Sequence, residues 1–150
     1  MANEYLVDHV TLLCDSYRHW TGRELVGSDL SAVEAARALY YSPFAVVSHD
    51  TASDPIFNYA NRKALELFEM EWAEFTSLPS RLSAEAVNQQ KRAESLKTVE
   101  EQGYIDGYSG VRISASGRRF NIANTVIWNL IDADGEYAGQ AAMFADWKFL

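Results

Sequence analysis

The spacing of hydrophobic residues predicts two helices at the start of the chain. Between positions 4 and 20, large apolar residues recur at steps of four and three, which is typical of an amphipathic helix, and Gly22 is suited to end it. These residues are Leu6, Val10, Leu13, Tyr17 and Trp20. Ser31 and Glu34 have the spacing of a capping box, so a second helix is predicted to begin there and to end before Pro43.

The segment from Pro55 to Phe75 changes from strand to helix within a few residues. Its beginning, 56–59, is aromatic and β-branched, which favours a strand, and the apolar run 44–48 predicts a partner strand in a hairpin. Asn61 stands where an N-cap side chain would accept a hydrogen bond from a free backbone amide. The residues that then follow at helical spacing predict one helix with a single apolar face: Ala64, Leu65, Phe68, Trp72 and Phe75.

After Pro79 the pattern predicts a polar helix and then strands. Ser83 is the expected N-cap of this helix and Gly103 its expected end, and its thin apolar stripe is typical of a helix at the rim of a core. From Tyr104 the period is two until the turn at Gly117. A long strand follows, in which apolar residues share one face: Phe120, Ile122, Val126, Trp128 and Leu130.

The sequence also predicts a cavity. Asn124 falls within that apolar row, so its amide is expected in the core, where it needs a partner or costs about 1–3 kcal/mol. The last strand, from Tyr137 to Leu150, has small residues at its middle, which leaves room inside. Internal hydrogen bonds for the amide and simple core packing for the aromatic residues are the alternatives. The expected ligand-binding residues are Phe68, Trp72, Phe75, Asn124, Trp128, Gln140 and Met143.

The second face of the long strand carries Ile127 and Ile131 and needs a cover. The apolar stripe of the N-terminal helix is the candidate. We expect this stripe to be buried partly on its own sheet and partly across the two-fold axis of a homodimer. The expected dimer interface is Leu6, Val10, Leu13, Tyr17 and Trp20.

Composition narrows the function classes. A chain of 150 residues with 48% hydrophobic residues fits one globular domain. The formal net charge of −8 argues against binding to nucleic acid or to an anionic membrane. Cys14 is the single cysteine, so no internal disulfide forms, and the first ten residues lack a secretion signal. A cytoplasmic location is therefore expected.

Motifs for catalysis and metal binding were not found. The sequence has no Cys-His zinc spacing, glycine-rich phosphate loop or serine-nucleophile elbow. His49, Asp50 and Asp54 are explained by a turn, since Asp, Ser and Pro initiate turns. Arg81 and Arg112 have the fork geometry to hold a carboxylate, although exposed arginines usually only face solvent. We expect neither an enzyme nor a metal site.

Four separate runs, in order between about Phe44 and Leu150, resemble a known family. They are FNYANRKALELFEM, LPSRLSAE, YSGVRISASGRRF and MFADWKFL. The chain resembles the MEKHLA family, whose domain has a PAS-like fold. The resemblance implies an α+β domain over residues 44–150, with a five-stranded antiparallel sheet and short helices on one face, preceded by an N-terminal helical extension over residues 1–43.

The resemblance also implies a function. MEKHLA domains are related to the C-terminal domain of plant class III homeodomain-leucine zipper transcription factors, although this chain has no DNA-binding segment and lacks the hexapeptide that names the family. A sensory or interaction module that binds a small molecule, a protein partner or both is implied. A small acid-base enzyme on a cone-shaped α+β fold and a ligand-free dimerisation domain are the alternatives, and strand order separates the two folds.

Familiar PAS cofactors are not expected. Among PAS-like domains, flavin photoreceptors use a cysteine on a helix over the pocket, and haem sensors commonly use a histidine on the long helix. Here Cys14 lies outside that region, and His9, His19 and His49 all precede it. The resemblance therefore implies a protein without flavin or haem, whose absorbance spectrum has no flavin or Soret band.

Overall fold

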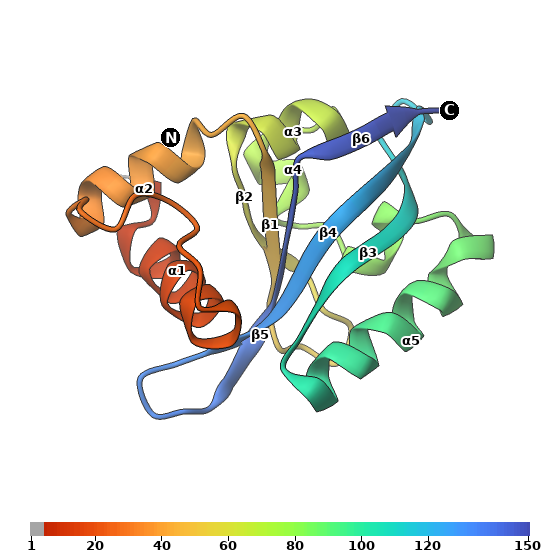
Figure 1. Ribbon diagram of the computed structural model, residues 1–150. Helices are drawn as coiled ribbons and strands as arrows, with labels where there is room; N and C mark the ends of the chain where they lie inside the picture. Colours follow the sequence, from red (N-terminus) through yellow and green to blue (C-terminus); the bar gives the residue numbers. More distant parts are fainter. Residues whose placement is uncertain (1–4) are drawn as a thin grey trace.

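The computed structural model describes residues 5–150, which form one antiparallel sheet with helices on both faces (Figure 1). Neighbouring strands follow the order β2-β1-β5-β4-β3, and a sixth short strand, β6, pairs with β4. The strands are β1 (Ala45–His49), β2 (Phe57–Ala60), β3 (Tyr104–Ile113), β4 (Arg119–Ile131), β5 (Tyr137–Phe144) and β6 (Asp146–Phe149).

The helices are α1 (Val7–Thr21), α2 (Ala32–Tyr40), α3 (Arg62–Phe68), α4 (Trp72–Phe75), the 3₁₀ helix η2 (Ser80–Ser83) and α5 (Ala86–Gln102). Figure 1 shows α1 and α2 on one side of the sheet and α5 on the other. The short elements α4 and η2 connect α3 to α5. Among the described residues, no helix has the length and apolarity that crossing a membrane requires.

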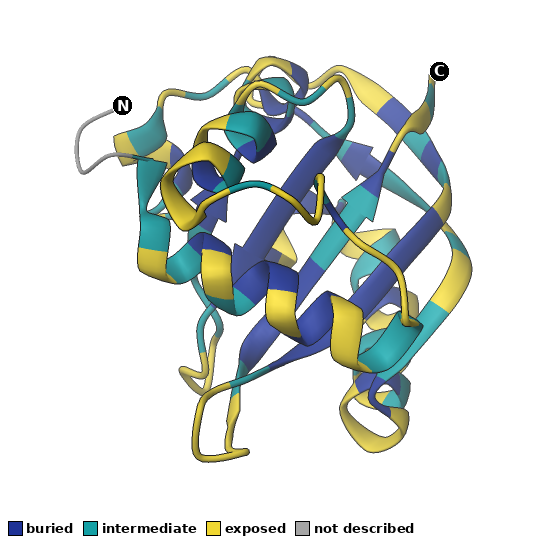
Figure 2. Cartoon of the chain, turned by 60° about the vertical axis from the view of Figure 1, so that its left-hand side comes forward, coloured by how far each residue is buried: buried dark blue, intermediate teal, exposed yellow. Residues whose placement is uncertain are grey.

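A hydrophobic core lies on each face of the sheet. The first core, beneath α1 and α2, includes Leu13, Tyr17 and Trp128. The second core, beneath α3, includes Phe68 and Phe120. In Figure 2 the central strands are dark blue, whereas the helices carry exposed residues on their outer sides. Because both faces are covered, the sheet has apolar residues on both sides.

The N-terminal helices end and begin as the sequence predicts. Gly22 adopts a left-handed conformation with φ 70°, and its N–H donates to the carbonyl of Arg18. At the start of α2, the Ser31 hydroxyl accepts from the backbone N–H of Glu34 at 3.2 Å, while the Glu34 carboxylate accepts from the Ser31 N–H at 2.9 Å. The capping box is therefore confirmed.

Asn61 ties the β1–β2 hairpin to the helices around it. Its side-chain oxygen accepts from the backbone N–H of Ala64 at 3.2 Å, which confirms it as the N-cap of α3, and from that of Val46 at 3.0 Å. Its amide nitrogen donates to the carbonyls of Leu39 and Phe44. One buried side chain thus joins α2, β1 and α3.

The prediction of one helix from Asn61 to Phe75 is wrong, because the chain breaks after Phe68. Glu69 takes a left-handed conformation with φ 57°. The hydroxyl of Ser114, in the β3–β4 turn, donates to the Glu69 carboxylate, and the Ala115 N–H donates to the Phe68 carbonyl at 3.0 Å. These contacts with the turn accompany the break, and α4 then starts in a new direction.

The long polar helix begins later than predicted. Ser83 belongs to η2, where its hydroxyl donates to the Ser80 carbonyl, and Glu85 is the N-cap position of α5. The end at Gly103 is confirmed, with φ 100°. A Cβ at Gly103 would overlap the ring of Trp20, so this position needs glycine for both backbone conformation and space.

The alternation along β4 changes phase at Asn124. This residue has φ 52°, so Ile122 and Thr125 face the same side of the sheet although their spacing is odd. Val126, Trp128 and Leu130 consequently belong to the first core, beneath α1. The prediction that α1 covers Ile127 is therefore wrong, because Ile127 faces the opposite side.

The predicted last strand is two strands. β4 pairs Val126 with Met143 of β5, and Ala123 with Asp146 of β6. The break between β5 and β6 thus lies opposite Asn124. The alternation of β4 and that of the β5–β6 segment therefore change at the same level of the sheet.

Candidate functional site

An internal cavity lies between the sheet and the helices η2 and α5. Its volume is about 40 Å³, which is room for only a few water-sized molecules. The lining is mostly apolar but includes polar residues, among them Arg92 of α5 and Gln140, whose amide bonds α5. The residues that line it are Val47, Ser48, His49, Phe57, Phe68, Ser83, Arg92, Leu96, Arg112, Ile122, Thr125, Ile127, Gln140, Ala141, Ala142 and Phe144.

Two of the seven expected ligand-binding residues, Phe68 and Gln140, line this cavity. Phe75 lies one layer behind, stacked on Phe57 with ring centroids 4.2 Å apart. Trp128 is fully buried, but it lies in the first core, where Met143 packs as well. The phase change at Asn124 turns Trp128 away from the cavity, and Met143 of β5 pairs with Val126, which belongs to the same first core.

Asn124 and Trp72 also lie elsewhere. The Asn124 side chain is exposed and donates to the Asp146 carboxylate at 2.8 Å, so the expectation of a core amide is wrong. Trp72 packs edge-on against Tyr59 at 6.1 Å, beside the first core, because the break after Phe68 redirects α4. Among residues 5–150, the buried side-chain amides are instead those of Asn61, Asn129 and Gln140.

Asn129 and Gln140 hold the last turns of α5 on the sheet. The Asn129 amide donates to the carbonyls of Val99 and Glu100, and the Gln140 amide donates to the Leu96 carbonyl and to the Asn129 side-chain oxygen. Glu100 lies in the last turn of α5, where a carbonyl has no partner inside the helix, so the Asn129 amide supplies one. The Val99 carbonyl accepts from the Gly103 N–H as well as from Asn129. The cavity and α5 are therefore connected through Gln140.

Three polar atoms at the cavity are buried without a hydrogen-bond partner among the described residues. They are Nε2 of His49, Nε of Arg92 and Oγ1 of Thr125. His49 is the last residue of β1, and burial lowers the pKa of its imidazole, helped by the charge of Arg92. Buried polar groups are usually paired. Because these three atoms have no partner within residues 5–150, a bound molecule could form hydrogen bonds with them.

Sequence reasoning missed His49, Arg92 and Thr125. His49 looked like a turn residue, and the phase change hid Thr125. Arg92 did have a detectable signal, because it lies four residues before Leu96 and seven before Val99. At helical spacing these three positions share the face of α5 that packs on the sheet.

The expected interface stripe of α1 lies against the chain's own sheet. Val10, Leu13 and Tyr17 are 1%, 0% and 3% exposed within one chain. Leu6 and Trp20 are partly buried, and the Trp20 indole N–H donates to the Asn129 carbonyl at 2.9 Å. The three central residues of the stripe thus have almost no surface left for a partner.

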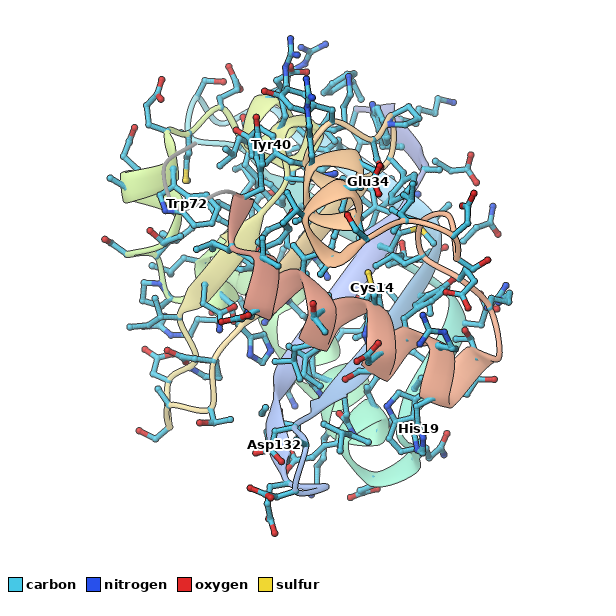
Figure 3. The ribbon with its side chains drawn as sticks, turned by 90° about the vertical axis from the view of Figure 1, so that its left-hand side faces the viewer. Cys14, His19, Glu34, Tyr40, Trp72 and Asp132 are labelled. Atoms are coloured by element: carbon cyan, nitrogen blue, oxygen red, sulfur yellow. The ribbon has the colours of Figure 1, made fainter. Side chains whose placement is uncertain are left out.

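Cys14 lies on α1, on the side of the sheet away from α5 (Figures 1 and 3). It belongs to the first core, and burial raises the pKa of its thiol to about 11. A protonated thiol behind the sheet has no access to the cavity.

Other candidate groups form ordinary surface contacts. Arg81 is exposed and pairs with Asp54 at 3.1 Å, so it is not part of the cavity. Within residues 5–150, no group of three or more His, Cys, Asp or Glu residues is arranged to hold a metal ion.

His9 forms a polar contact between α1 and the sheet. Its Nε2 lies 2.8 Å from the hydroxyl of Ser48, and burial lowers the pKa of the imidazole to about 4. The folded protein therefore keeps His9 neutral in mildly acidic solution, where the unfolded chain takes up a proton near pH 6.5.

This difference predicts an acid-dependent loss of stability. Above pH 6.5 His9 is neutral in both the folded and the unfolded chain and does not change the free energy of unfolding. As the pH falls toward 4, the unfolded chain takes up the proton first, and the free energy of unfolding decreases by about 2–3 kcal/mol. Urea unfolding at pH 7.5 and 4.5 measures it. His9→Gln, which can still bond Ser48, should reduce the pH dependence. The matched change His19→Gln, at an exposed position of the same helix, should leave the pH dependence as in wild type. If the free energy of unfolding changes equally with pH in both variants, the assignment to His9 is disproved.

The MEKHLA domain model matches residues 7–149, so the match includes α1 and α2. Homeobox-leucine zipper protein HOX29 of Oryza sativa subsp. indica is 27% identical over 142 residues, which are 92% of this chain and 16% of the relative. ATHB-9 of Arabidopsis thaliana is 20% identical over 140 residues, 90% of this chain and 17% of the relative. The chain spans about one-sixth of the length of these curated relatives.

Solved structures share the fold. A PAS domain from Colwellia psychrerythraea has a TM-score of 0.64 at 18% identity, covering 74% of this chain and 92% of that one. The light-state dimer of the fungal blue-light photoreceptor Vivid has a TM-score of 0.62 at 16% identity, covering 90% of each chain. The predicted PAS-like α+β fold is therefore confirmed. With the family model covering nearly all of the sequence, the chain belongs to the MEKHLA domain family.

Proposed function

We propose that this domain is a sensory module that binds a small molecule in the cavity beneath α5. The observation that carries the proposal is the set of three buried, unpartnered polar atoms in a mostly apolar lining. Ligand pockets commonly combine an apolar lining with a few convergent polar groups. The homeobox-leucine zipper relatives support a regulatory role for the module.

The output of such a module would pass through α5. Gln140 lines the cavity and also bonds the Leu96 carbonyl of α5 at 2.9 Å. A ligand that recruits the Gln140 amide would weaken that bond, and α5 carries few other buried residues, with Val87 84% exposed. A weakly packed helix is the element whose position a small ligand can change.

The rival enzyme function lacks support at this site. Acid-base chemistry needs a paired carboxylate or a His-Asp pair facing the cavity. The lining provided by residues 5–150 contains His49 but no Asp or Glu. The cone-shaped fold proposed for that rival also differs from the PAS-like fold. Absence of enzymatic activity stays a prediction.

Flavin does not fit the residues present. The structural neighbours include a Light-Oxygen-Voltage domain described with a flavin analogue. A cavity of about 40 Å³ admits only a few atoms, far fewer than a three-ring flavin, and Cys14 lies behind the sheet. A protein free of flavin and haem remains the expectation.

Homodimer formation is also proposed. The Vivid structure is a light-state dimer by its description, and the likeness covers 90% of both chains. Since the centre of the α1 stripe is buried within one chain, a dimer would use other surface, with only Leu6 and Trp20 partly exposed from the expected set.

Native mass spectrometry of freshly purified protein tests ligand binding. We expect wild-type protein to retain an additional small mass. Ala142→Val adds two carbons to the cavity wall and should lose that mass, because little volume remains. Ala93→Val adds the same carbons to an exposed site of α5 and should retain it. Wild-type protein that always has the bare chain mass, and that no metabolite in a broad panel stabilises against heat, would contradict the proposal.

A further inference from the structure

Two buried arginines at the cavity have no acidic partner. Arg92 on α5 and Arg112 on β3 are 8% and 7% exposed. Neither belongs to an ion pair among the described residues. Arg112 donates to the Val111 carbonyl at 3.0 Å and to the Tyr108 hydroxyl at 3.2 Å, whereas the Nε of Arg92 is buried without any acceptor.

This arrangement is unfavourable for the domain on its own. Burial and the like charge of Arg112 lower the pKa of the Arg92 guanidinium to about 10, which still leaves it charged at neutral pH. Buried charges are normally paired, because leaving water without a partner costs several kcal/mol. The chain has 21 acidic residues and a net charge of −8, yet none of its carboxylates within residues 5–150 pairs with either arginine.

The two arginines stand between the cavity and the surface. They line the internal cavity, and they also line a groove of about 180 Å³ between α5 and β3. Lys91 and Asn121 line the same groove, so its side chains offer positive charge and hydrogen-bond donors but no carboxylate. A ligand with one end in the groove and the other in the cavity would pass directly by both guanidinium groups.

We propose that the ligand is a small molecule with an oxyanion, a carboxylate or a phosphate, joined to a short apolar tail. The oxyanion lies between Arg92 and Arg112, whose planar groups match its oxygens with paired hydrogen bonds. The tail enters the cavity toward Phe68 and Phe144. This assignment rests on the proposed sensory function and specifies its ligand class.

The ligand neutralises a charge that the protein leaves unpaired. Binding would therefore add stability to the folded domain, and it would act on α5, the helix that carries Arg92. The cavity volume of about 40 Å³ limits the tail to a few carbon atoms unless α5 moves.

Thermal unfolding at low ionic strength tests the proposal, with butyrate, butyl phosphate and the neutral butyramide as probes. Without a probe, Arg92→Met should be at least as stable as wild type, because an unpaired buried charge is removed. Butyrate or butyl phosphate should raise the Tm of wild type saturably. The difference between these two probes identifies the preferred oxyanion.

Variants show whether the arginines are responsible. Arg92→Met should raise at least tenfold the probe concentration that gives half of the maximal rise in Tm. Arg112→Met provides a second variant should Arg92→Met fail to fold. Lys97→Met removes an exposed positive charge from the same helix and should respond like wild type. An equal response of Arg92→Met and Lys97→Met would mean general salt stabilisation and would overturn the proposal.

The remaining outcomes separate this inference from the proposed function. Butyramide that stabilises wild type as well as butyrate would overturn the anion assignment while leaving a small-molecule cavity in place. No response of wild type to either anionic probe would overturn the assignment as well, whatever Arg92→Met does to the Tm. The native mass measurement would then judge the sensory function independently.

Discussion

Replacing Asn61 with alanine is expected to bring the domain close to unfolding. The Asn61 side chain is fully buried and bonds four backbone groups, in Leu39, Phe44, Val46 and Ala64. Alanine removes all four bonds, and although the Leu39 carbonyl keeps the Ser42 N–H as a donor, the buried N–H groups of Val46 and Ala64 lose the Asn61 oxygen as acceptor. The expected loss is about 3–5 kcal/mol, a large part of the about 5–15 kcal/mol that stabilises a typical domain.

Ser31→Ala is the matched control for this prediction. Ser31 is also an N-cap, but it is exposed and its side chain bonds only the start of its own helix. Its loss should cost about 1 kcal/mol. Urea unfolding followed by circular dichroism measures both variants. Equal losses would show that Asn61 acts only as a helix cap and that its bonds to α2 and β1 contribute nothing.

Replacing Leu13 with aspartate should unfold the chain. Leu13 is 0% exposed and packs in the first core between α1 and the sheet. Burying a carboxylate there without a partner, together with the loss of apolar contacts, is expected to cost more than about 4 kcal/mol. The sequence predicts Leu13 as part of a dimer interface, but within one chain this side chain has no exposed surface that a partner could contact.

Thr11→Asp is the control, since Thr11 lies on the exposed side of α1. It should keep the wild-type melting curve and the wild-type mass in light scattering. A folded, soluble Leu13→Asp protein would contradict the packing described for α1.

Light scattering on wild type at high micromolar concentration decides the dimer proposal. A measured mass of one chain would exclude a dimer.

Local sequence signals were sufficient for several helix ends. Gly22, Asn61 and Gly103 occupy positions whose backbone conformation or capping bonds need those residue types, and the structure uses them as predicted. Such signals depend on a few neighbouring residues, which explains why they could be recognised without the fold. They located most helices and strands, but not the break after Phe68, the break between β5 and β6, or the side of the sheet that each residue faces.

The side of the sheet was decided at Asn124. Helices cover both faces of β4, so residues before and after Asn124 are apolar on both faces, and a change of phase leaves no mark in the hydrophobic pattern. Asparagine tolerates the left-handed conformation better than most residues, but only the simultaneous break between β5 and β6 selects it here. This single residue explains why Trp128 and Met143 were assigned to the wrong face.

The sequence alone determined the family resemblance, the α+β class and the presence of a strand of small residues beside a cavity. Motif order and residue size can be read along the chain. The tertiary structure alone decided that Arg92, Arg112 and His49 meet at that cavity. They come from α5, β3 and β1, and their spacing in the sequence carries no information about whether a carboxylate lies opposite them. Whether a buried charge has a partner depends on contacts between distant elements, and those contacts exist only in the folded chain.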